Sequence, residues 1–165
     1  MKPARCLILA CGNTLRGDDG IGPFLAAWAQ ERFQSQPEIR VIARQQWTPE
    51  LAEEISRAES VLFIDCSIEA APGSIALSPL TPVPPEQGLA THHLGAAELL
   101  ALAKEFYESL PRTALQLTIG AGSLELGEEF SDPVTAALPR ARILLEEAVL
   151  RVVAGQPGPS PDRST

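Results

Sequence analysis

The chain has few of the residues on which several kinds of function depend. It contains 13 lysines and arginines against 21 aspartates and glutamates, which gives a formal net charge of −8 in 165 residues. A nucleic acid or an anionic membrane would need a concentrated basic surface, so the sequence argues against both as partners. No apolar run approaches the roughly 20 residues that span a bilayer, and the apolar stretch after Lys2 and Arg5 is too short for a signal peptide. We therefore expect a cytosolic protein.

Cysteines and common catalytic motifs are also scarce. The three cysteines, Cys6, Cys11 and Cys66, include no CxxC pair, and their odd number fits a reducing compartment better than a disulfide framework. We expect Cys6 and Cys66 to be inert core thiols. The chain has no HExxH helix, no GxSxG elbow and no Gly-Lys-Ser/Thr phosphate loop. A nucleotide-binding enzyme is an alternative, but Gly20-Ile21-Gly22 lacks the third glycine of the dinucleotide fingerprint.

What the chain does contain is the composition of one globular domain. Apolar residues make up 45% and charged residues 21%, which is ordinary for a folded protein with its own core. We predict a single domain over residues 1–154. Residues 155–165 are rich in proline, glycine and serine and predict a disordered tail.

The hydrophobic patterns predict an α/β fold. Expected strands are 7–10, 39–43, 61–64, 74–78 and 114–119, and expected helices are 21–33, 49–55, 94–107 and 133–149. This order indicates a three-layer α/β/α domain with a five-stranded, mostly parallel sheet. Right-handed crossovers put the first strand between the second and third, with helices on both faces. The fourth strand follows the third through a turn, which favours antiparallel pairing.

Several local features follow from the same patterns. Ile21, Phe24, Leu25 and Trp28 predict the buried face of the first helix. Thr48-Pro49 and Asp132-Pro133 each predict an N-cap followed by proline at the first helical position. Pro139 should kink the last helix or mark the start of a second one.

Residues 12–23 carry the most distinctive pattern in the chain, Gly-Asn-Thr-Leu-Arg-Gly-Asp-Asp-Gly-Ile-Gly-Pro. They join the first strand to the first helix, at the sheet edge where open α/β folds bind ligands. Asp18 and Asp19 therefore lie near a helix amino terminus, whose dipole favours anions. One reading is that both only cap this helix. Because one aspartate suffices for a cap, we expect the second to have another role.

Two further positions complete a candidate metal site. The topology brings Asp19 close to Asp65, at the end of the third strand, where two carboxylates repel unless a cation or proton intervenes. His92 and His93 are the only histidines, and they precede a helix that should pack on the sheet. Two carboxylates and an imidazole would suit a first-row divalent metal. Taken singly, Asp65 could equally be a loop cap and either histidine a structural or solvated residue.

Residues 12–23 resemble the amino-terminal signature of the [NiFe]-hydrogenase maturation endopeptidases. Members of that family carry an acidic residue at the position of Asp19, an aspartate after the third strand as at Asp65, and a histidine followed by x-Leu-Gly. Thr91-His92-His93-Leu94-Gly95 fits only if His92 is the family's ligand, and His93 then falls on a variable position. The resemblance covers roughly residues 5–150.

The resemblance implies a nickel-dependent endopeptidase that trims a carboxy-terminal extension from a [NiFe]-hydrogenase large-subunit precursor. Asp19, Asp65 and His92 would be its catalytic and metal-binding residues, and would grip nickel supplied by the bound precursor. No organic cofactor is expected, and the protein would act as a monomer that binds its precursor transiently. A resident-metal hydrolase of another substrate and a non-catalytic nickel-dependent chaperone are the alternatives.

One segment departs from the family pattern. Many members have a Gly-Gly pair between the second strand and second helix, where this chain has Gln45-Gln46-Trp47. Because this segment lines the family's cleft, the substrate contacts here are expected to differ. Trp47 is either a platform for substrate or a packing residue.

Overall fold

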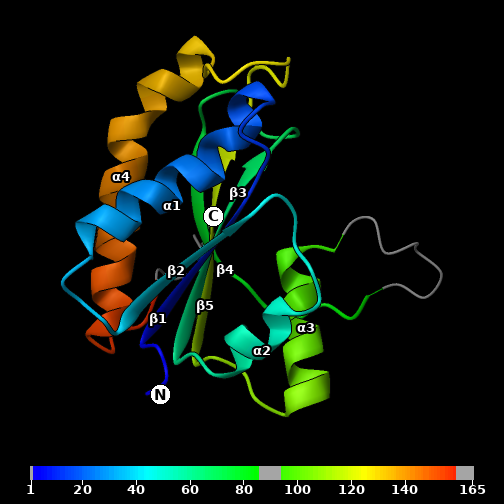
Figure 1. Ribbon diagram of the computed structural model, residues 1–165, viewed down its shortest axis with the longest axis vertical. Helices are drawn as coiled ribbons and strands as arrows, with labels where there is room; N and C mark the ends of the chain where they lie inside the picture. The colour runs from blue at the N-terminus through cyan, green and yellow to red at the C-terminus, as the bar shows by residue number, and fades with distance from the viewer. Residues whose placement is uncertain (1, 86–93, 159–165) are drawn as a thin grey trace, which may run out of the picture.

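The computed structural model describes residues 2–85 and 94–158, in which a sheet lies between two layers of helices (Figure 1). The strands are β1 (Cys6–Cys11), β2 (Ile39–Arg44), β3 (Ser60–Ser67), β4 (Ile75–Pro79) and β5 (Thr113–Gly120). The helices are the 3-10 helix η1 (Gly17–Gly20), α1 (Ile21–Arg32), α2 (Leu51–Ser56), α3 (Ala96–Tyr107) and α4 (Asp132–Val153).

The sheet has the predicted arrangement around β1. Its order is β2-β1-β3-β5-β4, so β1 lies between β2 and β3. All neighbouring pairs are parallel except β4 and β5, which are antiparallel. The antiparallel strand follows from the turn at Gly73, because a connection without a crossover helix reverses the chain direction. The α/β prediction is confirmed, including its one antiparallel strand.

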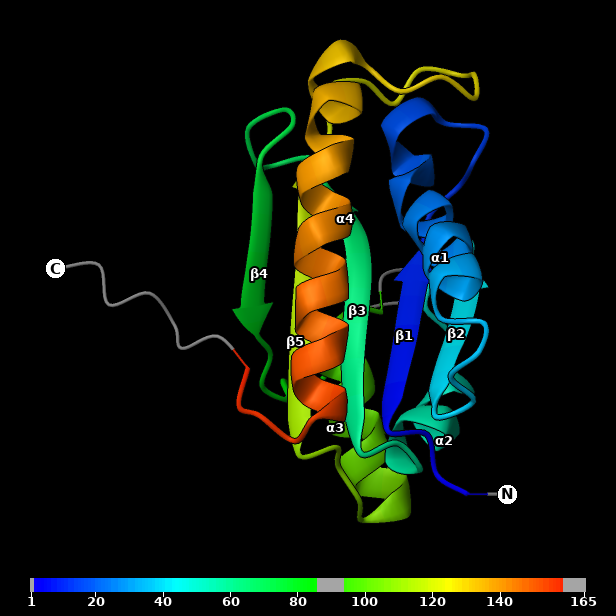
Figure 2. The same cartoon turned by 90° about the vertical axis from the view of Figure 1, so that its left-hand side faces the viewer.

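Two hydrophobic layers cover the two faces of the sheet. Cys6, Ile8 and Ala10 of β1 face the layer built by α1 and α4, whereas Leu7 and Leu9 face the layer built by α2 and α3. Figure 2 shows α1 and α4 side by side on their face. Every residue of β1 is buried, as expected for a central parallel strand covered on both sides.

The buried face of α1 differs from the predicted one. Ile21 and Leu25 are buried, but Phe24 is 38% exposed and packs edge-to-face on Phe130. Small residues take the positions nearest the sheet, since Gly22 and Ala26 are buried. A Cβ atom at Gly22 would lie 2.4 Å from the carbonyl oxygen of Cys11. The close approach of α1 to the end of β1 therefore requires glycine and turns the large Phe24 outward.

The structure also differs from the predictions at the starts of α2 and α4 and at Pro139. The N-cap of α4 is Ser131, not Asp132, and α2 begins at Leu51 after a turn rather than at Pro49. Pro139 lies inside one continuous helix, so the alternative of a second helix is wrong and the alternative of a kink stays a prediction. The helix continues because residues on both sides of Pro139 are held on the core, namely Val134, Ala137, Ala141 and Leu145.

The predicted tail and the search for a membrane-spanning helix depend on which residues are described. The tail prediction falls mainly on residues 159–165, which lie outside them. Within residues 2–85 and 94–158, no helix combines the length and the apolar character needed to cross a bilayer.

Candidate functional site

The candidate site lies where β1 and β3 separate. The last paired residues of these two strands are Ala10 and Ile64, so Asp65 is the first residue of β3 beyond that pairing. β3 itself continues to Ser67 alongside β5, which corrects the prediction that Asp65 ends the strand. β1 leads into η1 and α1, whereas β3 leads through a turn into β4, so the chain leaves the two neighbouring strands in different directions at this edge. The carboxyl edge of the strands is where open α/β sheets bind ligands.

Among the described residues, the donors to Asp65 all reach one of its two carboxylate oxygens. The Cys66 backbone N–H donates to Oδ1 at 2.7 Å, and the Cys11 thiol donates to the same oxygen at 3.4 Å. Burial raises the pKa of the Asp65 carboxyl, these two hydrogen bonds oppose the rise, and the charge of Asp19 adds to it. The fold thus brings Asp19 and Asp65 within electrostatic reach of each other.

Asp19 lies on η1, directly above the end of β1. Its Oδ2 accepts a hydrogen bond from the backbone N–H of Asn13 at 2.7 Å. The chain can fold back this tightly because Gly12 has a φ of 151°, and a Cβ atom there would lie 1.9 Å from the carbonyl oxygen of Asp19. The Gly12-Asn13 pair is therefore the turn that positions Asp19.

Asp18 has a different role, which the sequence analysis did not identify. Its buried carboxylate accepts hydrogen bonds from the backbone N–H groups of Gly122, Ser123 and Ser131, at 2.7 to 2.9 Å, and from the Ser131 hydroxyl at 2.6 Å. Burial alone would raise the pKa of Asp18, but these hydrogen bonds outweigh it and hold the pKa below its usual range. Asp18 thereby fixes residues 121–131, here termed the 121–131 loop, to the start of η1.

Neither aspartate caps α1, so the capping interpretation is wrong. The N-cap of α1 is Gly20, which makes no side-chain capping bond. The role of Asp18 cannot be recognised from local sequence, because the N–H groups that donate to its carboxylate lie more than 100 positions further along the chain.

Cys11 is a second residue of the site that the sequence analysis did not assign. Burial raises the pKa of its thiol, and the nearby Asp65 and Asp19 add to the rise, so the thiol stays protonated and acts as a donor. Burial also raises the pKa values of Cys6 and Cys66 to about 12. These values agree with the prediction that Cys6 and Cys66 are inert.

The predicted third ligand, His92, lies outside the described residues, as does His93. Within the described part of the chain, no three histidine, cysteine or acidic side chains are grouped closely enough to hold a metal. The two carboxylates share one feature. Their described hydrogen bonds fall on Oδ1 of Asp65 and Oδ2 of Asp19, which leaves one oxygen of each without a donor among the described residues.

Residues 45–47, where the chain departs from the family pattern, contribute one side chain to the core. Trp47 is only 8% exposed and packs edge-to-face on Phe63, with ring centroids 5.5 Å apart. Its large apolar surface belongs to the layer under α2 and α3. Trp47 is therefore a core residue, whereas Gln45 and Gln46 are exposed.

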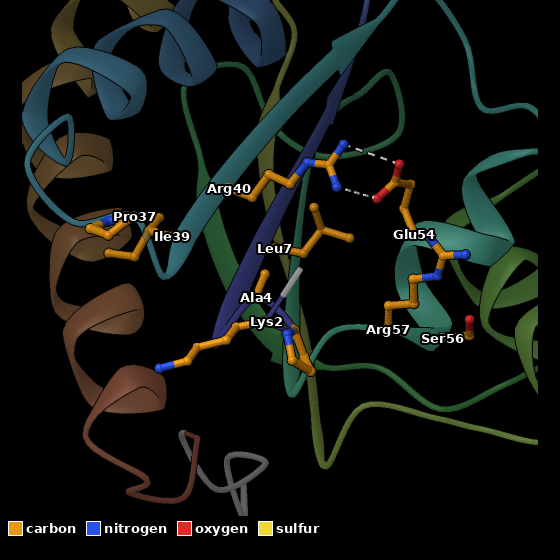
Figure 3. Close-up of a pocket in the computed structure, with 10 residues that line it drawn as sticks. Lys2, Ala4, Leu7, Pro37, Ile39, Arg40, Glu54, Ser56 and Arg57 are labelled. Carbon is orange, nitrogen blue, oxygen red and sulfur yellow. Dashed lines mark hydrogen bonds and ion pairs between the residues drawn. The ribbon is translucent and has the colours of Figure 1, made fainter.

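A cavity of about 520 Å³ lies at the other end of the sheet, between the starts of β1 and β2 and helix α2 (Figure 3). Its most prominent charges are already paired, because the Arg40 guanidinium donates to both carboxylate oxygens of Glu54 at 2.6 and 3.1 Å. The cavity contacts Leu7 near the start of β1, whereas Asp19 and Asp65 follow the strand ends. It is not part of the candidate site.

Solved structures share this fold over most of the chain. The hydrogenase maturating endopeptidase HybD from E. coli has a TM-score of 0.69 and 19% identity, with 94% of each chain covered. The [NiFe] hydrogenase maturation protease HycI from Thermococcus kodakarensis KOD1 has a TM-score of 0.66 and 22% identity, over 92% of this chain and 94% of that one. The hydrogenase 2 maturation peptidase from Thaumarchaeota archaeon SCGC_AB-539-E09 has a TM-score of 0.61 and 27% identity, over 88% and 97%.

Other comparisons found no relative. No protein-family model matches the chain, and no curated protein matches its sequence. The structural matches confirm the resemblance predicted from residues 12–23, because the chain has the fold of the hydrogenase maturation endopeptidases over nearly its whole length.

Proposed function

We propose that this chain, which has the fold of the hydrogenase maturation endopeptidases, is itself such an endopeptidase. It removes a carboxy-terminal extension from the precursor of a [NiFe]-hydrogenase large subunit once nickel has been inserted. The observation that carries this proposal is the pair of carboxylates at the point where β1 and β3 separate, Asp19 and Asp65, each with one oxygen that accepts no described hydrogen bond.

In this proposal the nickel belongs to the substrate. Asp19, Asp65 and His92 bind the nickel that the precursor carries, and two carboxylates with a neutral imidazole balance its charge. Backbone and thiol donors hold Asp19 and Asp65 in place before the precursor arrives, so little conformational freedom is lost on binding. Nickel docking then sets the position of the scissile peptide bond.

Hydrolysis of that bond requires water, a proton acceptor and a proton donor. Water adds to the scissile carbonyl carbon, the carbon–nitrogen bond breaks, and the departing amine takes up a proton. We propose that either a cleft carboxylate or a water polarised by the precursor's nickel supplies the base and nucleophile, and that the proton taken from the attacking water is returned to the amine.

Single substitutions in the site test the proposed roles. Asp19→Asn, Asp65→Asn and His92→Ala should each slow processing of a nickel-loaded precursor by roughly 100-fold or more, because each removes a direct ligand. The precursor's intact mass over time measures the rate, and thermal unfolding verifies the fold of each variant. His93→Ala is the matched control and should process at the rate of the native protein.

Processing, precursor binding and the metal content of the purified protein together separate the alternatives. A fully active His92→Ala protein would contradict the ligand assignment. Binding of the precursor without any change in its mass would indicate a chaperone instead of a peptidase. A metal that copurifies with the protein in the absence of precursor would indicate a resident-metal hydrolase.

A further inference from the structure

A small apolar pocket lies next to the candidate site, between the start of α1 and the 121–131 loop. Its volume is about 280 Å³, and its walls are Thr14 and Gly20 around η1, Phe24 and Ala27 of α1, and Glu128 and Phe130 of the loop. Figure 2 shows this loop, in yellow, reaching from the start of α4 across to the start of α1. None of the roles assigned above uses the pocket.

The pocket is connected directly to the residue that positions the candidate metal. Gly20 follows Asp19 in the chain, and Thr14 follows Asn13, whose backbone N–H holds the Asp19 carboxylate. A group bound in the pocket would therefore contact the residues that directly follow Asn13 and Asp19 in the chain. This places it close to whatever Asp19 binds.

Hydrogen bonds and aromatic packing fix the walls of the pocket. The Gly17 N–H donates to the Gly127 carbonyl and the Gly127 N–H donates to the Leu15 carbonyl, both at 2.9 Å. Phe24 and Phe130 pack edge-to-face with ring centroids 5.2 Å apart. The pocket is thus formed before any ligand binds, which reduces the entropy that binding would cost.

The surroundings of the pocket are apolar and acidic. Leu126, in the same loop, is 89% exposed, and Leu15 and Phe24 also present apolar surface to solvent. Glu125, Glu128 and Glu129 form no ion pair within residues 2–85 and 94–158. Arg142 stacks on the Phe24 ring at 5.4 Å, so one cation of this chain already lies beside the apolar surface. Apolar side chains beside carboxylates that form no described ion pair suit a partner that offers an apolar group next to a cation.

The volume of the pocket restricts the kind of ligand. Pockets for cofactors and other small molecules usually exceed ~300 Å³ and bury most of the ligand. The present pocket, at about 280 Å³, is smaller and suits one large side chain of a bound polypeptide. Its walls contain no histidine or cysteine that could make it a second metal site.

We propose that this pocket binds one large apolar side chain of the precursor, close to its nickel, with a neighbouring lysine or arginine of the precursor facing Glu128. The proposal rests on the proposed function, because it takes the hydrogenase precursor as the partner. It makes Phe24, Ala27 and Phe130 determinants of substrate specificity that act next to the metal-binding residues.

Filling the pocket tests the proposal without removing any packing. Ala27 is an exposed helical residue that lines the pocket, so Ala27→Leu adds volume there and keeps a strong helix former. Gln30→Leu, one turn along α1 at an exposed position outside the pocket, is the matched control. We expect Ala27→Leu to raise KM for the nickel-loaded precursor about tenfold, as misfits in apolar pockets do. Gln30→Leu should leave KM unchanged.

Direct binding of the nickel-loaded precursor separates failure of the pocket from failure of the proposed function. Equal Kd values for the native protein and Ala27→Leu would overturn the pocket proposal, whether or not cleavage occurs. Tight binding by the native protein without cleavage, weakened by Ala27→Leu, would support the pocket and contradict only the peptidase activity. Absence of binding by the native protein would contradict both.

A second pair of variants tests the cation. Glu128→Gln should raise KM about threefold at low salt, and the difference should diminish at high salt because screening weakens an exposed charge contact. Glu129→Gln is the matched control, since Glu129 adjoins Glu128 but does not line the pocket. Equal effects of the two substitutions would contradict a specific contact at Glu128.

Discussion

Asp18 and Asp19 are adjacent in the chain, yet their environments assign them separate tasks. The Asp18 carboxylate is buried and receives four hydrogen bonds from the 121–131 loop. Asp19 is partly exposed and accepts one described hydrogen bond, from Asn13. The first arrangement contributes stability, whereas the second leaves an oxygen available for a ligand.

Asp18→Ala should therefore destabilise the protein much more than Asp19→Ala. The substitution leaves three backbone N–H groups and one hydroxyl without their acceptor, which costs roughly 3–5 kcal/mol for a buried, hydrogen-bonded charge. Asp19→Ala should change the free energy of unfolding by less than about 1 kcal/mol, because the backbone N–H of Asn13 can then donate its hydrogen bond to water. Urea unfolding of both variants measures the difference. Equal stabilities would contradict the separation of tasks.

Cys11 should affect the rate of processing through Asp65. Its thiol donates to Oδ1 of Asp65, so Cys11→Ala removes a donor that orients this carboxylate. We expect kcat to fall about three- to tenfold, in line with one modest hydrogen bond to a charged group, and KM to change little. Cys11→Ser restores a donor and should recover most of the rate. An inactive Cys11→Ser protein beside an active Cys11→Ala protein would rule out this positioning role.

The sequence indicated some residues of the site but not others. Asp19 and Asp65 could be selected as candidates because the carboxyl edge of an α/β sheet is predictable and acidic residues near it are few. Asp18 and Cys11 could not, because their roles depend on contacts with Ser131 and Asp65, which lie 113 and 54 positions away in the chain. Such partners become known only once the loops are placed.

At the scale of the elements, small residues decide how closely the helices approach the sheet. The apolar pattern predicted the existence of α1, but it assigned Phe24 to the buried face, where Gly22 and Ala26 lie instead. Hydrophobicity alone cannot distinguish a large residue at the helix flank from a small one at the point of contact. Similarly, Pro139 left open whether α4 is kinked or gives way to a second helix, and tertiary packing keeps it one helix.

Pro139→Ala should stabilise the protein. Pro139 lies in the interior of α4, where proline removes one backbone hydrogen bond and crowds the preceding turn at a cost of about 3 kcal/mol. The unfolded state of the alanine variant gains entropy worth about 1 kcal/mol, so the net gain should be roughly 1–2 kcal/mol. A higher midpoint of thermal unfolding for Pro139→Ala than for the native protein would confirm this gain in stability.

Pro133 provides the control for this prediction. It lies in the first turn of the same helix, where its missing N–H has no partner in the helix. Pro133→Ala should therefore not stabilise the protein. A Pro139→Ala protein that melts at or below the native temperature would contradict the account of α4.

At the scale of the whole molecule, part of the topology was predictable. Right-handed crossovers predicted β1 between β2 and β3, and the turn after β3 predicted one antiparallel strand, but the place of β5 between β3 and β4 was not predicted. The joining of the 121–131 loop to η1 was not predictable, because loops that lack a periodic pattern carry little signal about their contacts. That joining forms both the support of Asp18 and the apolar pocket.

The central claim is that this protein recognises the nickel of its precursor through Asp19, Asp65 and His92. The most direct test is the intact mass of a hydrogenase large-subunit precursor from the same source, incubated with the protein in nickel-loaded and nickel-free forms. We predict loss of a carboxy-terminal peptide from the nickel-loaded form alone. Equal cleavage of both forms, or cleavage of neither, would contradict the claim.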